Sequence, residues 1–102
     1  MASITAPSTG DNPLEANSSF LFEGVVDSPR SVVVDVFLLR PGMGDRFCGQ
    51  VEVEEDSSHV RSWALRVHQI MIGPCYAVRA ISYTCGGELV ELASVEDVNF
   101  SP

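Results

Sequence analysis

Hydrophobic and polar residues alternate in short runs along most of this 102-residue chain, and clusters of Gly, Pro, Asp and Ser separate the runs. Valine alone occurs fourteen times. No segment keeps an i, i+3, i+4, i+7 apolar stripe over three turns, so no major helix is predicted. Alternation with β-branched residues is typical of strands. Strands are expected over residues 3–6, 18–26, 31–40, 46–54, 61–70 and 75–84, with one or two more within 88–100.

The parity of the apolar residues predicts which side of each strand faces the core, because successive side chains point to opposite faces. Asp35 falls on the odd face of its strand, so the even positions should point inward. The inward set is Phe20, Phe22 and Gly24; Val32, Val34, Val36 and Leu38; Phe47, Val51 and Val53; Trp63, Leu65 and Val67; and Tyr76, Val78 and Ala80. About seven short strands in one chain favour a single all-β domain over residues 1–102, an antiparallel sandwich with Greek-key links. A five- or six-stranded barrel is the alternative.

Four local motifs occur in order along the chain. They are a Pro just after the first strand, Phe-x-Phe-x-Gly at 20–24, Trp-x-Leu-x-Val at 63–67, and Gly-x-x-Tyr-x-Val-x-Ala at 73–80. This series resembles the bacterial immunoglobulin-like domains that occur in arrays on surface and exported proteins and as appendages of phage virion proteins. The resemblance implies an immunoglobulin-like antiparallel β-sandwich and places no functional site. The strand of Phe20 and Phe22 has no Cys, so an antibody-type disulfide between the sheets is absent. No second copy of the motif follows in the chain, although the family usually occurs in tandem.

The net charge, the absence of lysine and the short apolar runs argue against several classes of function. Six arginines, no lysine and fourteen acidic residues give a net charge of −8, which argues against a nucleic-acid partner. Without lysine, Schiff-base chemistry and Walker-type phosphate loops are excluded. The longest strictly apolar run, 36–39, is far too short for membrane insertion. The N-terminus has no signal-peptide pattern, so cell surface, virion and cytoplasm all stay open as locations.

Catalytic groups are sparse. His59 is expected in a polar turn and His68 on the outward side of a strand, and no Gly-x-Ser-x-Gly motif occurs. No enzyme and no cofactor are therefore predicted, with a small enzyme or ligand carrier that uses either histidine as the less favoured hypothesis. Cys48, Cys75 and Cys85 form no Cys-x-x-Cys motif and are expected to be reduced, non-catalytic thiols.

An acidic run, Glu52, Glu54, Glu55 and Asp56, offers the oxygen ligands that Ca²⁺ prefers. It lacks the spacing of a calcium-binding loop, and a solvated charged edge that discourages aggregation explains it equally well. No metal site is predicted, and a calcium-dependent adhesin remains a variant hypothesis.

The most informative feature is the outward side of the strands at 31–40 and 75–84, which immunoglobulin-like topology places side by side. It combines apolar residues with Asp35 and Arg79, which can form a salt bridge there. Since exposed apolar patches often mark contact sites, the predicted partner-binding residues are Val33, Asp35, Phe37, Leu39, Arg79, Ile81 and Tyr83. Alternatively, the N-terminal segment or the stretch 89–93 folds over this face and buries it.

These observations predict a non-enzymatic protein-interaction module that binds a protein partner or a second copy, as a homodimer, through the outer face of one sheet. The alternative is a structural, decoration or spacer domain of a virion or cell-surface assembly, in which the acidic charge serves solubility.

Overall fold

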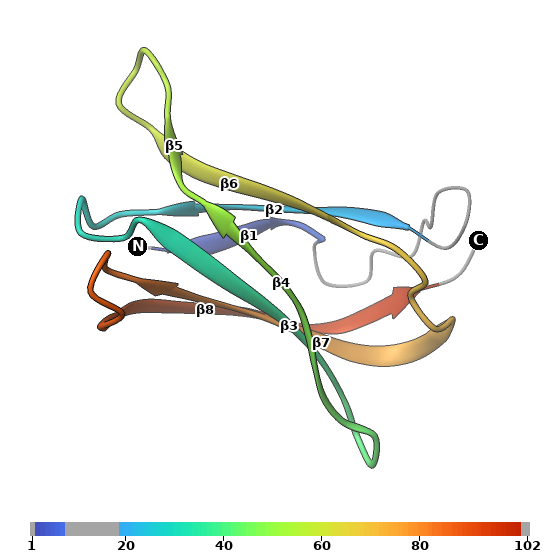
Figure 1. The fold of residues 1–102 in the computed structure, drawn as a ribbon. Coiled ribbons are helices and arrows are strands. Elements are labelled where there is room, and N and C mark those ends of the chain that lie inside the picture. Colours follow the sequence, from blue (N-terminus) through green and yellow to red (C-terminus); the bar gives the residue numbers. More distant parts are fainter. Residues whose placement is uncertain (1, 8–18, 101–102) are drawn as a thin grey trace.

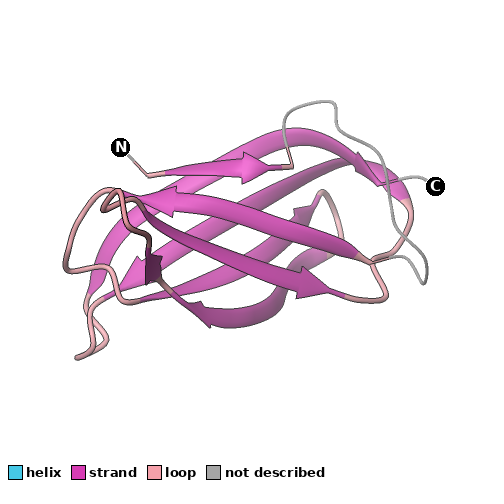
Figure 2. Cartoon of the chain, turned by 90° about the horizontal axis from the view of Figure 1, so that it is seen from above, coloured by secondary structure: helices cyan, strands magenta, loops and turns pink. Residues whose placement is uncertain are grey.

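The computed structural model describes residues 2–7 and 19–100, which form eight strands in two antiparallel sheets (Figures 1 and 2). The strands are β1 (Ser3–Ala6), β2 (Phe20–Val26), β3 (Val33–Arg40), β4 (Gly44–Glu52), β5 (Glu54–Glu55), β6 (Arg61–Val67), β7 (Gly73–Tyr83) and β8 (Leu89–Phe100). One sheet has the order β1-β2-β6-β5 and the other β4-β3-β7-β8. We call them, by their central strands, the β2–β6 sheet and the β3–β7 sheet.

This arrangement confirms the all-β sandwich and overturns the barrel alternative, because the strands divide into two separate sheets. The first expected strand, 3–6, coincides with β1, and residues 88–100 supply one strand, β8. Two details differ from expectation. β7 begins at Gly73, two residues before the expected strand 75–84, and Glu55, which lies beyond the expected strand 46–54, pairs with β6 as part of β5. The stretch 7–13, Pro-Ser-Thr-Gly-Asp-Asn-Pro, has the composition of a turn, and its residues 8–13 lie outside the described part of the chain.

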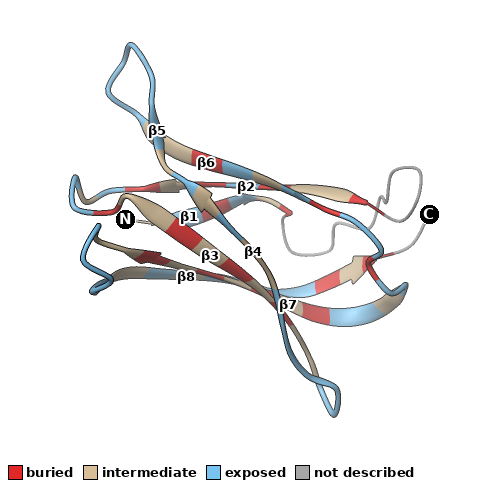
Figure 3. Cartoon of the chain, viewed as in Figure 1, coloured by how far each residue is buried: buried red, intermediate tan, exposed pale blue. Residues whose placement is uncertain are grey.

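The core fills the space between the two sheets, as the buried positions in Figure 3 show. The even residues of β3 and β7 point into it, as the alternation predicts: Val34, Val36, Leu38, Tyr76, Val78 and Ala80 are all buried. An aromatic cluster closes one end, where the Phe100 ring lies 5.0 Å from the ring of Tyr76 and 6.0 Å from that of Phe22. Edge-to-face contacts of this kind add to the stabilisation from burial.

Gly24 lets β2 approach its neighbours closely. It pairs with Trp63 on β6 and with Ile4 on β1. A Cβ at this position would lie 2.5 Å from Cζ2 of Trp63 and 2.7 Å from the carbonyl oxygen of Ser3. The buried indole therefore occupies the space that a side chain at position 24 would need.

A β-bulge in β4 corrects one sequence expectation. Val36 pairs with Gly49 and Phe37 pairs with Phe47, so Cys48 is an extra residue on β4. Such an insertion reverses the side-chain parity beyond it. Phe47, predicted to point inward, is instead 57% exposed, whereas Cys48, predicted to point outward, packs partly against the core.

None of the residues at 2–7 and 19–100 forms a helix long and apolar enough to cross a membrane.

Candidate interaction surfaces

The seven residues predicted to bind a partner lie on one face, the outer side of the β3–β7 sheet. The register pairs Val33 with Tyr83, Asp35 with Ile81, Phe37 with Arg79 and Leu39 with Ala77. All seven side chains are partly exposed, while the residues between them are buried. The structure thus brings the predicted residues together in four successive rows.

Neither segment considered as a cover lies over this face in the described part of the chain. β1 pairs with β2 in the opposite sheet, and β8 pairs with β7 within the same sheet. The register sets Leu92 opposite Ile81 and Leu89 opposite Tyr83, and these two leucines are 54% and 62% exposed. The C-terminal strand therefore widens the apolar face.

Phe47 also belongs to this face, although the alternation pattern placed it in the core. The bulge turns it outward beside Phe37, with the two ring centroids 5.5 Å apart. Gly49 was the available sequence signal, since a glycine inside a strand often marks a bulge. We define the outer patch as the exposed and half-exposed apolar side chains of this face: Val33, Phe37, Leu39, Phe47, Ile81, Tyr83, Leu89 and Leu92.

The salt bridge expected between Asp35 and Arg79 does not form. Their strands pair so that the two residues lie diagonally, one row apart, and Asp35 instead accepts a hydrogen bond of 2.8 Å from the amide of Gln50. No carboxylate among the described residues lies within 4 Å of the Arg79 guanidinium. At its centre, this face therefore carries Asp35 and Arg79, which are not paired with each other, and the register places two further carboxylates, Glu52 beside Val33 and Asp45 beside Leu39, at its β4 edge.

His59 and the end of the acidic run, Glu55 and Asp56, make local contacts. Glu55 accepts hydrogen bonds of 3.3 Å from His59 and from Arg61, and these bonds lower the pKa of its carboxyl group. Asp56 accepts the backbone N–H of Val60, which closes the turn before β6. Within the two described ranges, no three His, Cys, Asp or Glu side chains gather in a way that could hold a metal ion.

All three thiols are free, and none forms a disulfide. Cys75 and Cys85 are exposed, while Cys48 at the bulge is half-buried. Burial raises the pKa of the Cys48 thiol, because desolvation disfavours the thiolate.

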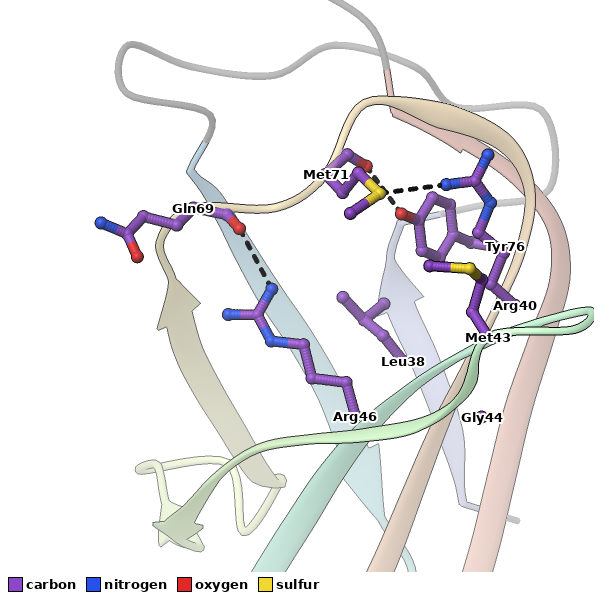
Figure 4. Close-up of a pocket in the computed structure, with 8 residues that line it drawn as sticks. All are labelled: Leu38, Arg40, Met43, Gly44, Arg46, Gln69, Met71 and Tyr76. Carbon is purple, nitrogen blue, oxygen red and sulfur yellow. Dashed lines mark hydrogen bonds between the residues drawn. The ribbon is translucent and has the colours of Figure 1, made fainter.

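A second surface feature is a hollow of about 190 Å³ at one end of the sandwich (Figure 4). The Tyr76 hydroxyl donates a hydrogen bond of 2.7 Å to the Met71 carbonyl, and the Arg40 guanidinium lies 5.2 Å from the Tyr76 ring centroid. On the other side, Arg46 donates to the carbonyl of Gln69 at 3.1 Å. We call this the Arg–Met hollow; its lining residues are Leu38, Arg40, Met43, Gly44, Arg46, Gln69, Met71 and Tyr76.

Sequence reasoning missed this hollow. Its lining comes from two separate segments, 38–46 and 69–76, and neither carries a motif that points to a ligand. Only the three-dimensional arrangement shows that the two arginines border the same space.

No family model matches this chain, and no curated protein matches it. Among solved structures, the chain is similar to the fibronectin(III)-like modules of Clostridium thermocellum CbhA, with a TM-score of 0.63 and 14% sequence identity over 100% of both chains. At that identity the likeness shows the fold alone. No comparison supports the more specific resemblance to bacterial surface or phage domains, and the chain is an immunoglobulin-like sandwich of the kind found in fibronectin(III)-like modules.

Proposed function

We propose that this chain is a non-enzymatic protein-interaction module and that its outer patch binds the same patch on a second copy. One observation carries the proposal: the β3–β7 sheet exposes apolar side chains on all four of its strands, among them Phe47, Leu89 and Leu92, each more than half exposed. The inner face of the same sheet already supplies the core. An apolar outer face is therefore not needed for folding, and such patches usually mark contact sites.

The two charges at the centre of this face, Asp35 and Arg79, favour a second copy as the occupant. In a two-fold symmetric interface, a residue that contacts another is contacted by it in return. Asp35 and Arg79 lie on one diagonal of the central rows, and Phe37 and Ile81 lie on the other. A two-fold axis in the plane between two such faces, along the Phe37–Ile81 diagonal, sets Asp35 of each copy against Arg79 of the other. The two unpaired charges then neutralise each other twice.

The size of the face predicts a weak complex. Strands lie about 4.8 Å apart, and alternate residues lie about 6.8 Å apart along a strand. Four strands and four rows therefore cover about 500 Å² per copy, or about 1,000 Å² for the pair, which is at the low end for a specific interface. A dissociation constant of about 10–100 μM is expected.

Sedimentation equilibrium over a range of protein concentrations tests the proposal. The wild type should dimerise, whereas Phe47→Ser and Leu92→Ser should remain monomeric. Val60→Ser is the matched control: Val60 is also exposed, at 46%, but precedes β6 in the opposite sheet, so this variant should dimerise normally.

Charge reversal then distinguishes the proposed pairing from other uses of the face. Asp35→Arg should abolish dimerisation, because it sets two arginines against each other, and the double variant Asp35→Arg/Arg79→Asp should restore it. A wild type that stays monomeric at 1 mM refutes self-association. A dimer that tolerates both the serine and the charge variants lies on another surface and refutes the assignment to the outer patch.

A spacer domain is the second candidate, favoured by the likeness to fibronectin(III)-like modules over the whole of both chains. β1 starts at one end of the sandwich and β8 finishes at the other (Figures 1 and 2), which suits modules joined end to end. This role needs no outer contact. A strictly monomeric wild type in the experiment above is the result that favours it.

A further inference from the structure

We propose that the Arg–Met hollow binds a carboxylate that is joined to a small apolar group. This site goes beyond the proposed function. It shares no residue with the outer patch, so either proposal can fail without the other.

Charge is the first observation. The chain has fourteen acidic residues and six arginines, yet no Asp or Glu lines this hollow and two arginines do. Elsewhere, Arg30 lies 3.8 Å from Glu88 and Arg61 lies 3.3 Å from Glu55. Neither Arg40 nor Arg46 has a carboxylate within 4 Å among the described residues. The lining of this hollow thus carries two positive charges and no negative one, whereas Asp45, Glu96 and Asp97 line the adjoining hollow on the other side of Arg40; the lining of the Arg–Met hollow itself favours an anion.

The two guanidinium groups are held in place and still have hydrogen atoms to donate. Arg46 donates from one terminal nitrogen to the Gln69 carbonyl and from the other to the His68 carbonyl, both at 3.1 Å. A guanidinium has five N–H groups, so three remain. Arg40 donates to the Met71 sulfur at 3.4 Å, and a thioether is a weak acceptor. A carboxylate would be a much better acceptor, because hydrogen bonds between ionised partners are roughly twice as strong as neutral ones.

The rest of the lining is apolar and adaptable. Leu38 is buried and lies between Arg46 and Tyr76 in the view of Figure 4. Met43 and Met71 are 61% and 57% exposed, and methionine side chains fit irregular apolar ligands because they are flexible and polarizable. These exposed methionines would gain contacts from an apolar group placed beside the guanidiniums.

The volume limits the ligand to a small one. About 190 Å³ corresponds to the share of about six water molecules in the liquid, so the hollow holds roughly six to eight non-hydrogen atoms. A six-carbon carboxylate has this size. Two sources share the chemistry, namely a free short-chain carboxylate and the C-terminal residue of a peptide with an apolar side chain.

The test follows the methyl resonances of the methionines by NMR while hexanoate is added to the full chain. Met43 and Met71 line the hollow, so their methyl groups report binding there directly. Saturable shifts of Met43 and Met71 are expected at millimolar hexanoate. Hexanamide, which has the same shape without the charge, should bind at least tenfold more weakly.

Arg40→Gln should weaken hexanoate binding at least tenfold, whereas Arg30→Gln, which removes an arginine outside the hollow, should not. In case Arg40→Gln unfolds, Met43→Glu provides a second variant: Met43 is exposed, and the new carboxylate would occupy the guanidiniums and abolish binding. Val60→Glu is its control for added charge at an exposed apolar position.

A short peptide that ends in Leu distinguishes the two sources when the binding of its free acid is compared with that of hexanoate. The C-terminal amide of the same peptide, which lacks the carboxylate, is the control. Tighter binding of the free acid than of hexanoate identifies a peptide C-terminus, and weaker binding identifies a free carboxylate. The proposal is overturned if hexanoate causes no saturable shift up to 50 mM, if hexanamide binds equally well, or if both Arg40→Gln and Met43→Glu leave binding unchanged.

Discussion

Replacing Gly24 by Ala tests the closest contact in the sandwich. The new Cβ would lie 2.5 Å from Cζ2 and 2.6 Å from Cε2 of Trp63, and 2.7 Å from the Ser3 carbonyl oxygen. Non-bonded carbon atoms normally lie about 3.5–4.0 Å apart, so the overlap with the indole is about 1 Å. Trp63 is 4% exposed and packs in the core, and the Ser3 oxygen belongs to the backbone of β1. Neither can move away without disturbing its own contacts.

Overpacking of a core costs about 1–3 kcal/mol. Since this overlap involves a ring and a backbone atom together, we expect a loss at the upper end, about 2–3 kcal/mol. A domain of this size loses about 4–8 °C in melting temperature per kcal/mol, so Gly24→Ala should melt about 10–20 °C below the wild type. Urea unfolding followed by the fluorescence of Trp63, the single tryptophan, and thermal unfolding followed by circular dichroism both measure the effect.

Gly86→Ala is the matched control. A Cβ there has Thr84 Oγ1 at 3.8 Å as its nearest neighbour, an ordinary contact, so its stability should stay within about 0.5 kcal/mol of the wild type. The reasoning is refuted if Gly24→Ala unfolds at the wild-type midpoint, or if both variants lose the same amount.

Three further predictions concern single groups. At pH 8, Cys48 should react with iodoacetamide several-fold more slowly than the exposed Cys75, because burial raises the Cys48 pKa and shields its sulfur; peptide mapping of the alkylated chain measures both rates. Glu55 has a lowered pKa in the folded chain, so its stabilisation is present above the unfolded pKa and is lost as the pH falls through the folded one. The urea midpoint of Glu55→Gln should therefore lie below that of the wild type at pH 7, and the two should converge in acid. Tyr76→Phe keeps the ring but loses the 2.7 Å hydrogen bond to the Met71 carbonyl, so thermal unfolding should show a loss of about 1 kcal/mol.

The inner and outer faces of β3 and β7 could be predicted from sequence because both strands keep a strict period of two. Asp35 and Arg79 fixed the outward parity, since a charged side chain seldom points into a core. On β4 the alternation predicts the wrong face for Phe47, because the bulge at Cys48 interrupts the period of two. The alternation also gave no strand at Glu55, because a two-residue strand such as β5 is too short to show a period.

The outer patch could be predicted only in part. Its members on β3 and β7 follow from parity, but Leu89 and Leu92 join it through the pairing of β8 with β7, which a local pattern does not specify. The Arg–Met hollow could not be predicted, because residues 38–46 and 69–76 meet there only through the packing of the two sheets.

The bulge at Cys48 connects the two proposed surfaces. Leu38 points into the core and pairs with Arg46, whereas Phe37 points outward and pairs with Phe47. If the same sequence, Cys48 included, paired regularly with β3, every β4 side chain on the Arg46 side of Cys48 would point to the opposite face. Phe47 would then turn inward, and Arg46 would leave the hollow and lose its bonds to the carbonyls at 68 and 69. The bulged pairing of this sequence therefore both places an aromatic ring in the outer patch and supplies one of the two guanidiniums of the Arg–Met hollow.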